Sequence, residues 1–407
     1  MEIYIGIDWS AAKHDIAFVN DASSVIAQLT IPHRPDGFLQ VDATRQALNI
    51  PAQQAIVGIE KAYSLLIDFL WARGYQQVYV LPSNVVKSSR RLYRQSGART
   101  DASDACLIAN LLRTDRARFQ VWCPDSPLTC RMRAKVSWFS HLTEMQVRLG
   151  NRLRAVLLRY YPAAVEVFRD LAAPITLEFL CEYPTPQQAC RLTYPQFEQF
   201  ARQHGYTRLK KLPAAFARLQ TPHPEAAPSI VAMYQTEAVQ QARLLVTVVQ
   251  QHYQAARELG QLFRQHPDYD LFHSLPGAGE FLAPALLTKF GDDRRRLPTP
   301  ASVQALAGTC PVTDQSGKKR VIRFRRACDH EFRHIAQEWA RHSLDQSVWA
   351  NAYFERVRPH CDSESHAYRC LANRWLAIAW KLWQSRQPYD EGYHLKQRAA
   401  HCQPRGR

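Results

Sequence analysis

The strongest constraint on the fold is the run of three segments rich in valine and isoleucine at the start of the chain, at 3–8, 14–20 and 24–31. Short apolar segments divided by polar residues are typical of consecutive antiparallel strands. Two further strand-like segments lie at 53–60 and 77–81, and helical patterns at 36–48, 64–74, 82–95 and 101–113. Because three strands precede alternating helices and strands, we expect a mixed α/β sheet covered by helices.

The chain has 407 residues, which is too long for one ordinary domain. Residues 132–161 and 229–266 contain no proline and predict two long helices, whereas nine prolines interrupt 162–228. The two helices form either an antiparallel arm around an insertion or a compact helical domain. We therefore predict a domain at 1–122, a helical linker at 130–266 with the insertion, a mainly helical domain at 268–388 and a disordered tail at 389–407.

The formal charge of +16 and pI of about 9.5 point to a polyanionic partner. A membrane surface is the weaker choice, since no apolar run is long enough to span a bilayer. The opening residues, MEIYIGIDWS, lack the pattern of a signal peptide, so we expect a cytoplasmic protein. Ten cysteines are scattered from Cys106 to Cys402 without a CxxC pair, which argues against disulfides and zinc and favours free thiols.

Acidic residues stand where the predicted elements begin and end. Asp8 ends the first strand and Glu60 the fourth, while Asp101 and Asp104 open a helix with a spacing that puts both on one face. Each acid alone is more often structural, as a helix cap or a loop residue. Together they form the carboxylate set with which a ribonuclease-H-like domain holds Mg²⁺ or Mn²⁺ to cut phosphodiesters.

Three segments around these acids carry a specific resemblance: GIDWSAAKHDIAF, VGIE and RTDASDACLIANLL. They resemble the RuvC-like DEDD domain of the insertion-sequence transposase family numbered one hundred and ten, also called bridge-RNA-guided recombinases. LGNRLRAVL at 149–157 is similar to the family's helical linker. The segment that begins with LPGAGEFLAPALLTKFGD and ends with SGKKR is similar to its C-terminal serine domain. The resemblance implies a DNA transposase that binds donor and target duplexes and a structured guide RNA, as a homo-oligomer at the bacterial nucleoid.

Ser316 lies in CPVTDQSGKKRVIRFRR. A Ser-Gly pair is usually a turn, and serine is a poor nucleophile without activation. The basic residues that follow could hold phosphates: Lys318, Lys319, Arg320, Arg323, Arg325 and Arg326. The family resemblance implies that Ser316 is the recombination nucleophile. It would form a covalent bond to DNA and act with the four acids in a composite site.

A second basic stripe precedes the DxxD acids and comprises Lys87, Arg90, Arg91, Arg94 and Arg99. It could bind phosphate beside the acids, although a solvated helix face is the commoner explanation. Arg294, Arg295 and Arg296 form a third basic cluster.

One further motif is HExxH at 330–334, the helical zinc motif of metalloproteases, with Cys328 nearby. We interpret it as fortuitous, because a metalloprotease also needs a third ligand and a substrate cleft, and the helix falls where the family resemblance expects a packing element. Cys328 could complete a chance metal site.

Three other functions fit parts of the sequence. A junction nuclease would use water in place of Ser316. An actin-like ATPase fits GIDWSAAKHDIAF, although its phosphate loops need glycine and the turn here is Ser10-Ala11-Ala12. A non-enzymatic binding protein would need the acids only as structural groups.

Overall fold

The computed structural model describes residues 2–402 except 61–63, 94–99, 169 and 318. The chain folds into two compact units, Met1–Pro124 and Asp125–Arg407. Within the described residues, every helix is too short or too polar to cross a lipid bilayer.

A five-stranded mixed sheet forms the centre of the first unit, in the order β3-β2-β1-β4-β5. The strands are β1 (Ile3–Trp9), β2 (Lys13–Asn20), β3 (Val25–Pro32), β4 (Ile56–Ile59) and β5 (Gln77–Val80). β1, β2 and β3 pair antiparallel, and β4 runs parallel to both β1 and β5. The predicted α/β fold class is confirmed.

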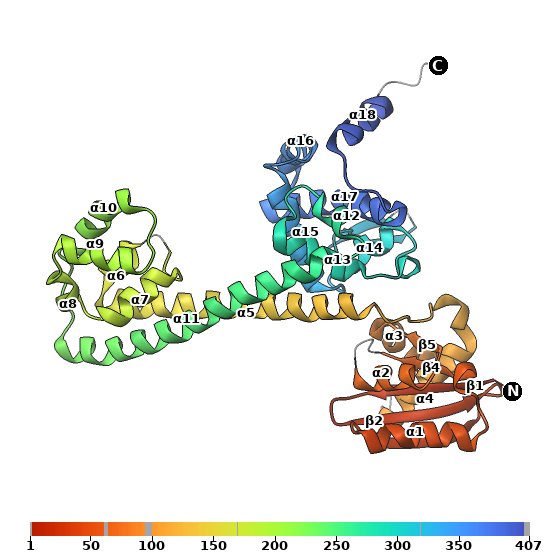
Figure 1. The fold of residues 1–407 in the computed structure, drawn as a ribbon. Helices are drawn as coiled ribbons and strands as arrows, with labels where there is room; N and C mark the ends of the chain where they lie inside the picture. Colours follow the sequence, from red (N-terminus) through yellow and green to blue (C-terminus); the bar gives the residue numbers. More distant parts are fainter. Residues whose placement is uncertain (1, 61–63, 94–99, 169, 318, 403–407) are drawn as a thin grey trace. The chain divides into compact units, whose positions relative to one another are not determined.

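Helices cover both faces of this sheet (Figure 1). They are α1 (Pro35–Ala47), α2 (Leu65–Ala72), α3 (Ser83–Tyr93) and α4 (Asp101–Asp115). Side chains alternate along β1, so Ile3, Ile5 and Ile7 enter the core under α1 and α2. Tyr4 enters the opposite core with α4, which places Gly6 and Asp8 on the α4 face as well. The predicted strand at 53–60 is shorter than expected, because a 3-10 turn at Ala52–Gln54 precedes β4.

Two long helices, α5 (Pro127–Tyr160) and α11 (Pro228–Arg264), run side by side in the second unit (Figure 1). Their pairs fix an antiparallel register: Lys135 contacts Glu258, and Arg152 Nη2 lies 2.6 Å from Glu237 Oε1. Five short helices lie between them and share a separate core: α6 (Pro162–Val167), α7 (Pro174–Glu182), α8 (Pro186–Cys190), α9 (Tyr194–Gln203) and α10 (Leu212–Leu219). The antiparallel arm describes this segment better than a compact domain does.

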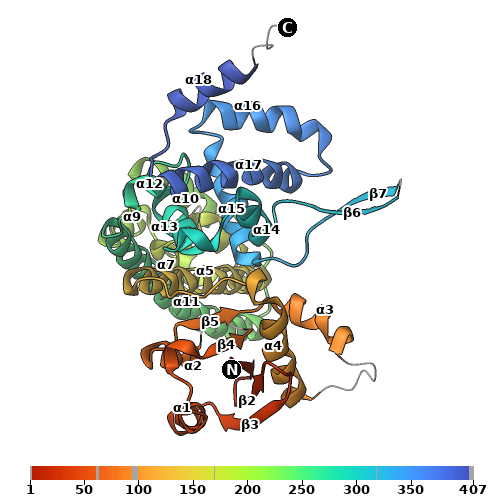
Figure 2. The same cartoon turned by 90° about the vertical axis from the view of Figure 1, so that its right-hand side faces the viewer.

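The rest of the second unit is mainly helical around a core that contains Trp339, Trp375 and Trp383. Its helices are α12 (Tyr269–His273), α13 (Gly279–Phe290), α14 (Pro300–Leu306), α15 (His330–Ser343), α16 (Val348–Val357), α17 (Glu364–Ser385) and α18 (Glu391–Cys402). A two-stranded antiparallel hairpin, β6 (Val312–Ser316) and β7 (Lys319–Arg323), extends from this core (Figure 2).

Two features of this part differ from the sequence analysis. The basic segment around Ser316, for which the sequence predicts only a Ser-Gly turn, forms the hairpin. The tail from 389 was expected to be disordered, yet residues 391–402 form α18. Glu391 anchors that helix, because its carboxylate accepts hydrogen bonds from the hydroxyls of Ser347 and Tyr389 and from Trp349 N.

Candidate active site

A pair of glycines brings α4 onto the strands that carry the acids. Gly6 and Gly58 are register partners in β1 and β4. A Cβ on Gly6 would lie 2.0 Å from the carbonyl oxygen of Ala105, and one on Gly58 would lie 2.7 Å from Ile108. Only glycine permits this close approach.

Asp8 and Glu60 each lie two residues beyond one of these glycines. Because side chains two apart in an extended strand share a face, Asp8 points to the side that α4 covers. Glu60 directly follows β4, next to the register pair Ile7 and Ile59. Both acids are half-buried. The sequence placed Asp8 at the end of its strand, and it lies within β1, followed by Trp9.

The N-terminus of α4 supplies the other two acids. Thr100 caps the helix in a reciprocal capping box with Ser103, which fixes the first turn. Asp101 lies one turn before Ala105, the residue packed on Gly6, and Asp104 immediately precedes it. The docking of α4 therefore sets the first turn, with Asp101 and Asp104, against the strand that carries Asp8.

Basic side chains hold two of these acids. Lys13 Nζ lies 3.1 Å from Asp101 Oδ2, and this contact raises the pKa of Lys13. Arg90 Nε and Nη2 donate to Asp104, which is buried. Among the described residues, no three of these carboxylates have oxygens within 4.8 Å of one another. The donor set still suits a hard divalent cation, since all four offer carboxylate oxygens.

On the opposite face of the sheet, two imidazoles lie in contact near Phe38 of α1. His14 is fully buried on β2, and its Nε2 is 2.8 Å from His33 Nδ1. Burial, helped by His33, lowers the pKa of His14 to about 4. His14 is therefore neutral at physiological pH. Neither histidine was singled out from the sequence.

The basic stripe before the DxxD acids divides into different roles. Lys87 is exposed on α3, whereas Arg90 is engaged by Asp104. The Arg91 side chain, Arg94 and Arg99 lie outside the described residues.

Ser316 ends β6 at the tip of the exposed hairpin, where it pairs with Lys319. Gly317 follows with φ of +56°, so the predicted Ser-Gly turn is confirmed. Lys319, Arg320 and Arg323 project from β7 and are exposed. Arg326 is also exposed, Arg325 Nε donates to the carbonyl of Cys310, and Lys318 lies outside the described residues.

The base of the hairpin is held by Phe324. The guanidinium carbons of Arg333 and Arg369 lie 4.4 Å and 4.7 Å from the centre of its ring. These stacked cations connect the hairpin to α15 and α17.

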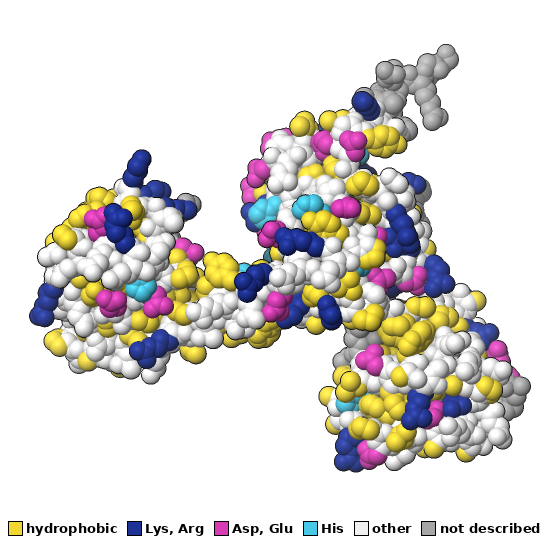
Figure 3. Space-filling model, viewed as in Figure 1, with side chains coloured by type: hydrophobic (Ala, Val, Ile, Leu, Met, Phe, Trp, Pro, Cys, Tyr) yellow, Lys and Arg dark blue, Asp and Glu magenta, His cyan; other side chains and the backbone are white. Residues whose placement is uncertain are grey.

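The HExxH motif opens α15 and borders a cleft of about 1040 Å³ lined by α5, α13 and α15. Figure 3 shows histidine side chains on the surface of the second unit in this region. Glu331 is held by Lys289 Nζ at 2.7 Å, and Cys328 Sγ lies 4.0 Å from His330 Nδ1. Within the described ranges, these groups do not form a three-ligand cluster.

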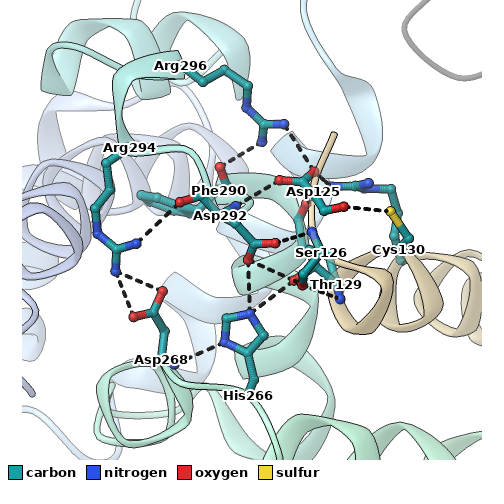
Figure 4. Close-up of polar contacts among 12 residues, drawn as sticks. Asp125, Ser126, Thr129, Cys130, His266, Asp268, Phe290, Asp292, Arg294 and Arg296 are labelled. Carbon is teal, nitrogen blue, oxygen red and sulfur yellow. Dashed lines mark hydrogen bonds and ion pairs between the residues drawn. The ribbon is translucent and has the colours of Figure 1, made fainter. Parts of the chain in front are cut away.

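The cluster of three arginines at 294–296 is largely structural (Figure 4). Arg294 Nη2 contacts both oxygens of Asp268, and Arg296 donates to Phe290 O. Arg295 Nε lies 3.0 Å from Asp293 Oδ1, and the Arg295 side chain is 80% exposed.

Figure 4 also shows a buried histidine that ties α5 to the segment after α13. His266 Nδ1 accepts from Asp268 N, so Nε2 carries the proton and donates to Asp292 at 3.0 Å. Asp292 also accepts from Thr129 Oγ1 and Ser126 N. These hydrogen bonds outweigh burial and hold the pKa of Asp292 far below its usual value.

Comparisons with known proteins agree with this architecture. A family model described as transposase matches residues 5–162, and one described as transposase of the IS116/IS110/IS902 family matches 269–355. The IS117 mini-circle protein of Streptomyces coelicolor is 27% identical over 96% of both chains. The insertion element IS116 protein of Streptomyces clavuligerus is 25% identical over 98% of both, and the IS900 protein of Mycobacterium paratuberculosis 25% identical over 95% of this chain and 97% of its own.

The fold and these matches define a transposase of the DEDD type, a DNA-processing enzyme. The chain belongs to the IS110 family of insertion-sequence transposases.

Proposed function

We propose that this transposase is an RNA-guided recombinase that exchanges DNA strands through a phosphoserine bond at Ser316. Residues 1–122 act as the RuvC-like metal-binding domain and 268–388 as the serine domain, joined by the helical linker at 130–266. The partners are donor and target duplexes, a structured guide RNA and further copies of the chain. Because the substrate is chromosomal DNA, we place the protein at the nucleoid.

The observation that supports the metal site is the close packing of α4, which carries Asp101 and Asp104 on its first turn, against the strand that carries Asp8 and against β4, at Gly6 and Gly58. Asp8, Glu60, Asp101 and Asp104 would hold Mg²⁺ or Mn²⁺. When bound, the cations would neutralise charge on the reacting phosphate. Lys13 and Arg90 would then be released from Asp101 and Asp104 and become available to DNA phosphates.

The chemistry at Ser316 is a phosphoryl transfer. The Ser316 hydroxyl loses its proton and its Oγ forms a bond to phosphorus, while the bond from phosphorus to the leaving sugar oxygen breaks and that oxygen takes a proton. A sugar hydroxyl of another strand then attacks the phosphoserine and restores the serine hydroxyl. The exposed cations of β7 support this assignment, because they lie beside Ser316 and can hold a phosphate.

The test is recombination in vitro with full-length protein, RNA from the flanking DNA, end-labelled donor and target duplexes, and Mg²⁺. We expect labelled DNA covalently attached to the protein on a denaturing gel. Ser316→Ala should abolish the adduct, whereas Thr313→Ala on the same hairpin should keep it. Asp8→Asn or chelation should suppress both adduct and product.

Other results would overturn parts of the proposal. Cleavage that continues in Ser316→Ala without any adduct would identify a nuclease that uses water. Recombination that does not depend on the RNA would remove the guide from the mechanism. Asp8→Asn with normal activity would make the acids structural.

A further inference from the structure

Two cysteines and a histidine converge at the start of α17. Cys361, His366 and Cys370 each place a ligand atom within 4.8 Å of the other two. All three side chains are half-buried. Their spacing is CxxxxHxxxC, which contains no CxxC pair and therefore does not stand out as a zinc motif in the sequence.

Local structure explains the convergence. Ser363 caps α17 by accepting a hydrogen bond from His366 N, which starts the helix at Glu364. His366 and Cys370 are four apart and therefore share one helix face. Cys361 ends the 3-10 turn at Arg358–His360, where its backbone N donates to Arg358 O, and it packs against the core.

We propose that Cys361, His366 and Cys370 form a zinc site. Two thiolates and one imidazole are a ligand set that zinc prefers, and water can complete the tetrahedron. Zinc bonds of about 2.0–2.3 Å need ligand atoms slightly closer than the 4.8 Å limit, which small side-chain rotations supply. Binding converts both thiols to thiolates and releases two protons to solvent.

Burial and the neighbouring Cys361 thiol raise the pKa of Cys370, and Arg369 and Arg374 oppose this only in part. The metal itself would therefore have to displace the thiol protons. The Asp362 carboxylate lies 3.6 Å from His366 Nδ1 and can orient the ring. Since Arg369 also stacks on Phe324, the metal would stiffen the turn of α17 that holds the base of the Ser316 hairpin.

Cobalt provides the direct test on full-length protein, kept reduced, stripped with a chelator and titrated with Co²⁺. We expect one equivalent to give a sulfur-to-cobalt charge-transfer band and the strong visible bands of a tetrahedral site, both lost when Zn²⁺ is added. Cys361→Ser, Cys370→Ser and His366→Asn should each weaken binding at least about tenfold. Cys190→Ser and the His330→Asn/His334→Asn variant are controls that should keep the spectrum.

A second measurement on the unmodified protein avoids any folding defect of the variants. Zn²⁺ should slow alkylation of Cys361 and Cys370 by iodoacetamide at least about tenfold, as read by mass spectrometry, and leave exposed Cys190 unaffected. Absence of the charge-transfer band, or alkylation of Cys361 and Cys370 that Zn²⁺ leaves unchanged, would overturn the zinc site. Mg²⁺ at the carboxylates gives neither signal, so this test is independent of the proposed recombination.

Discussion

Arg90 holds both carboxylate oxygens of Asp104, with Nε 3.1 Å from Oδ1 and Nη2 2.9 Å from Oδ2. Arg90, which is predicted to bind nucleic acid, is thus hydrogen-bonded to Asp104, which is predicted to bind metal. The two predictions are compatible if Arg90 exchanges Asp104 for a DNA phosphate when metal binds.

Arg90→Ala tests this exchange. We expect Mn²⁺ to bind several-fold more tightly without DNA, because a partly exposed ion pair that the metal must displace is worth up to about 1 kcal/mol. DNA affinity should fall in the same variant. Calorimetric Mn²⁺ titration measures the first effect, and exposed Lys87→Ala on the same helix is the control. Weaker metal binding in Arg90→Ala would show that Arg90 supports the site instead of competing for it.

Gly6→Ala tests how α4 is docked. The added Cβ would lie 2.0 Å from Ala105 O and 2.5 Å from Ala109 N, so the helix must shift. We expect a loss of about 1–3 kcal/mol in unfolding free energy and lower activity, as Asp8 moves relative to α4. Gly150→Ala, with nothing within 4 Å of its added Cβ, should instead stabilise α5 by about 0.5–1 kcal/mol. Urea unfolding compares the two, and equal effects would contradict the packing argument.

The sequence predicts features that depend on local patterns, but not those that depend on tertiary packing. Strand-end and helix-start acids are local signals, so the sequence can nominate Asp8, Glu60, Asp101 and Asp104 as candidates. The position of α4 against β1 depends on backbone contact at Gly6, which no local pattern encodes. The hairpin was missed because β6 and β7 are exposed and lack an alternating apolar face. The helix at 391–402 was missed because tertiary contacts of Glu391, and not its own pattern, anchor it.

The buried His14 predicts an acid-labile β2. Its folded pKa of about 4 lies below the ordinary value of 6.5, so the unfolded state binds more protons between these pH values. The stability from neutral His14 is complete above about pH 6.5 and is lost as pH falls toward 4, at a cost of roughly 2 kcal/mol by pH 5. Hydrogen-exchange protection factors of β2 amides between pH 7.5 and 5 measure this loss. His14→Gln should flatten the dependence, and an unchanged slope would assign it to other groups.

Alanine substitutions of Arg294 and Arg295 should have different effects, the first on stability and the second on nucleic-acid binding. Arg294 contacts buried Asp268 and stacks over Trp383 at 5.1 Å, so Arg294→Ala should cost about 3–5 kcal/mol. Arg295→Ala should leave stability nearly unchanged, since its side chain is 80% exposed. If Arg295 meets a phosphate, its loss should lower the salt dependence of nucleic-acid binding by about one ion. Thermal unfolding and filter binding at several salt concentrations distinguish these outcomes.

Lys319 and Arg320, which are adjacent on β7, lie on opposite faces of the hairpin. Lys319 is the register partner of Ser316, so both side chains leave the same face, while Arg320 leaves the other with Gln315. A phosphate attacked by Ser316 would therefore contact Lys319 directly. We expect Lys319→Ala to slow formation of the covalent adduct by about 10- to 100-fold, as loss of one charge-assisted hydrogen bond of about 1.5–3 kcal/mol implies.

Arg320→Ala should weaken DNA binding but leave the adduct rate at saturating DNA within about twofold. Single-turnover measurements at saturating DNA separate the rate from affinity. Equal slowing by both variants would mean that the hairpin presents its whole charge, and not one face, to the reacting phosphate.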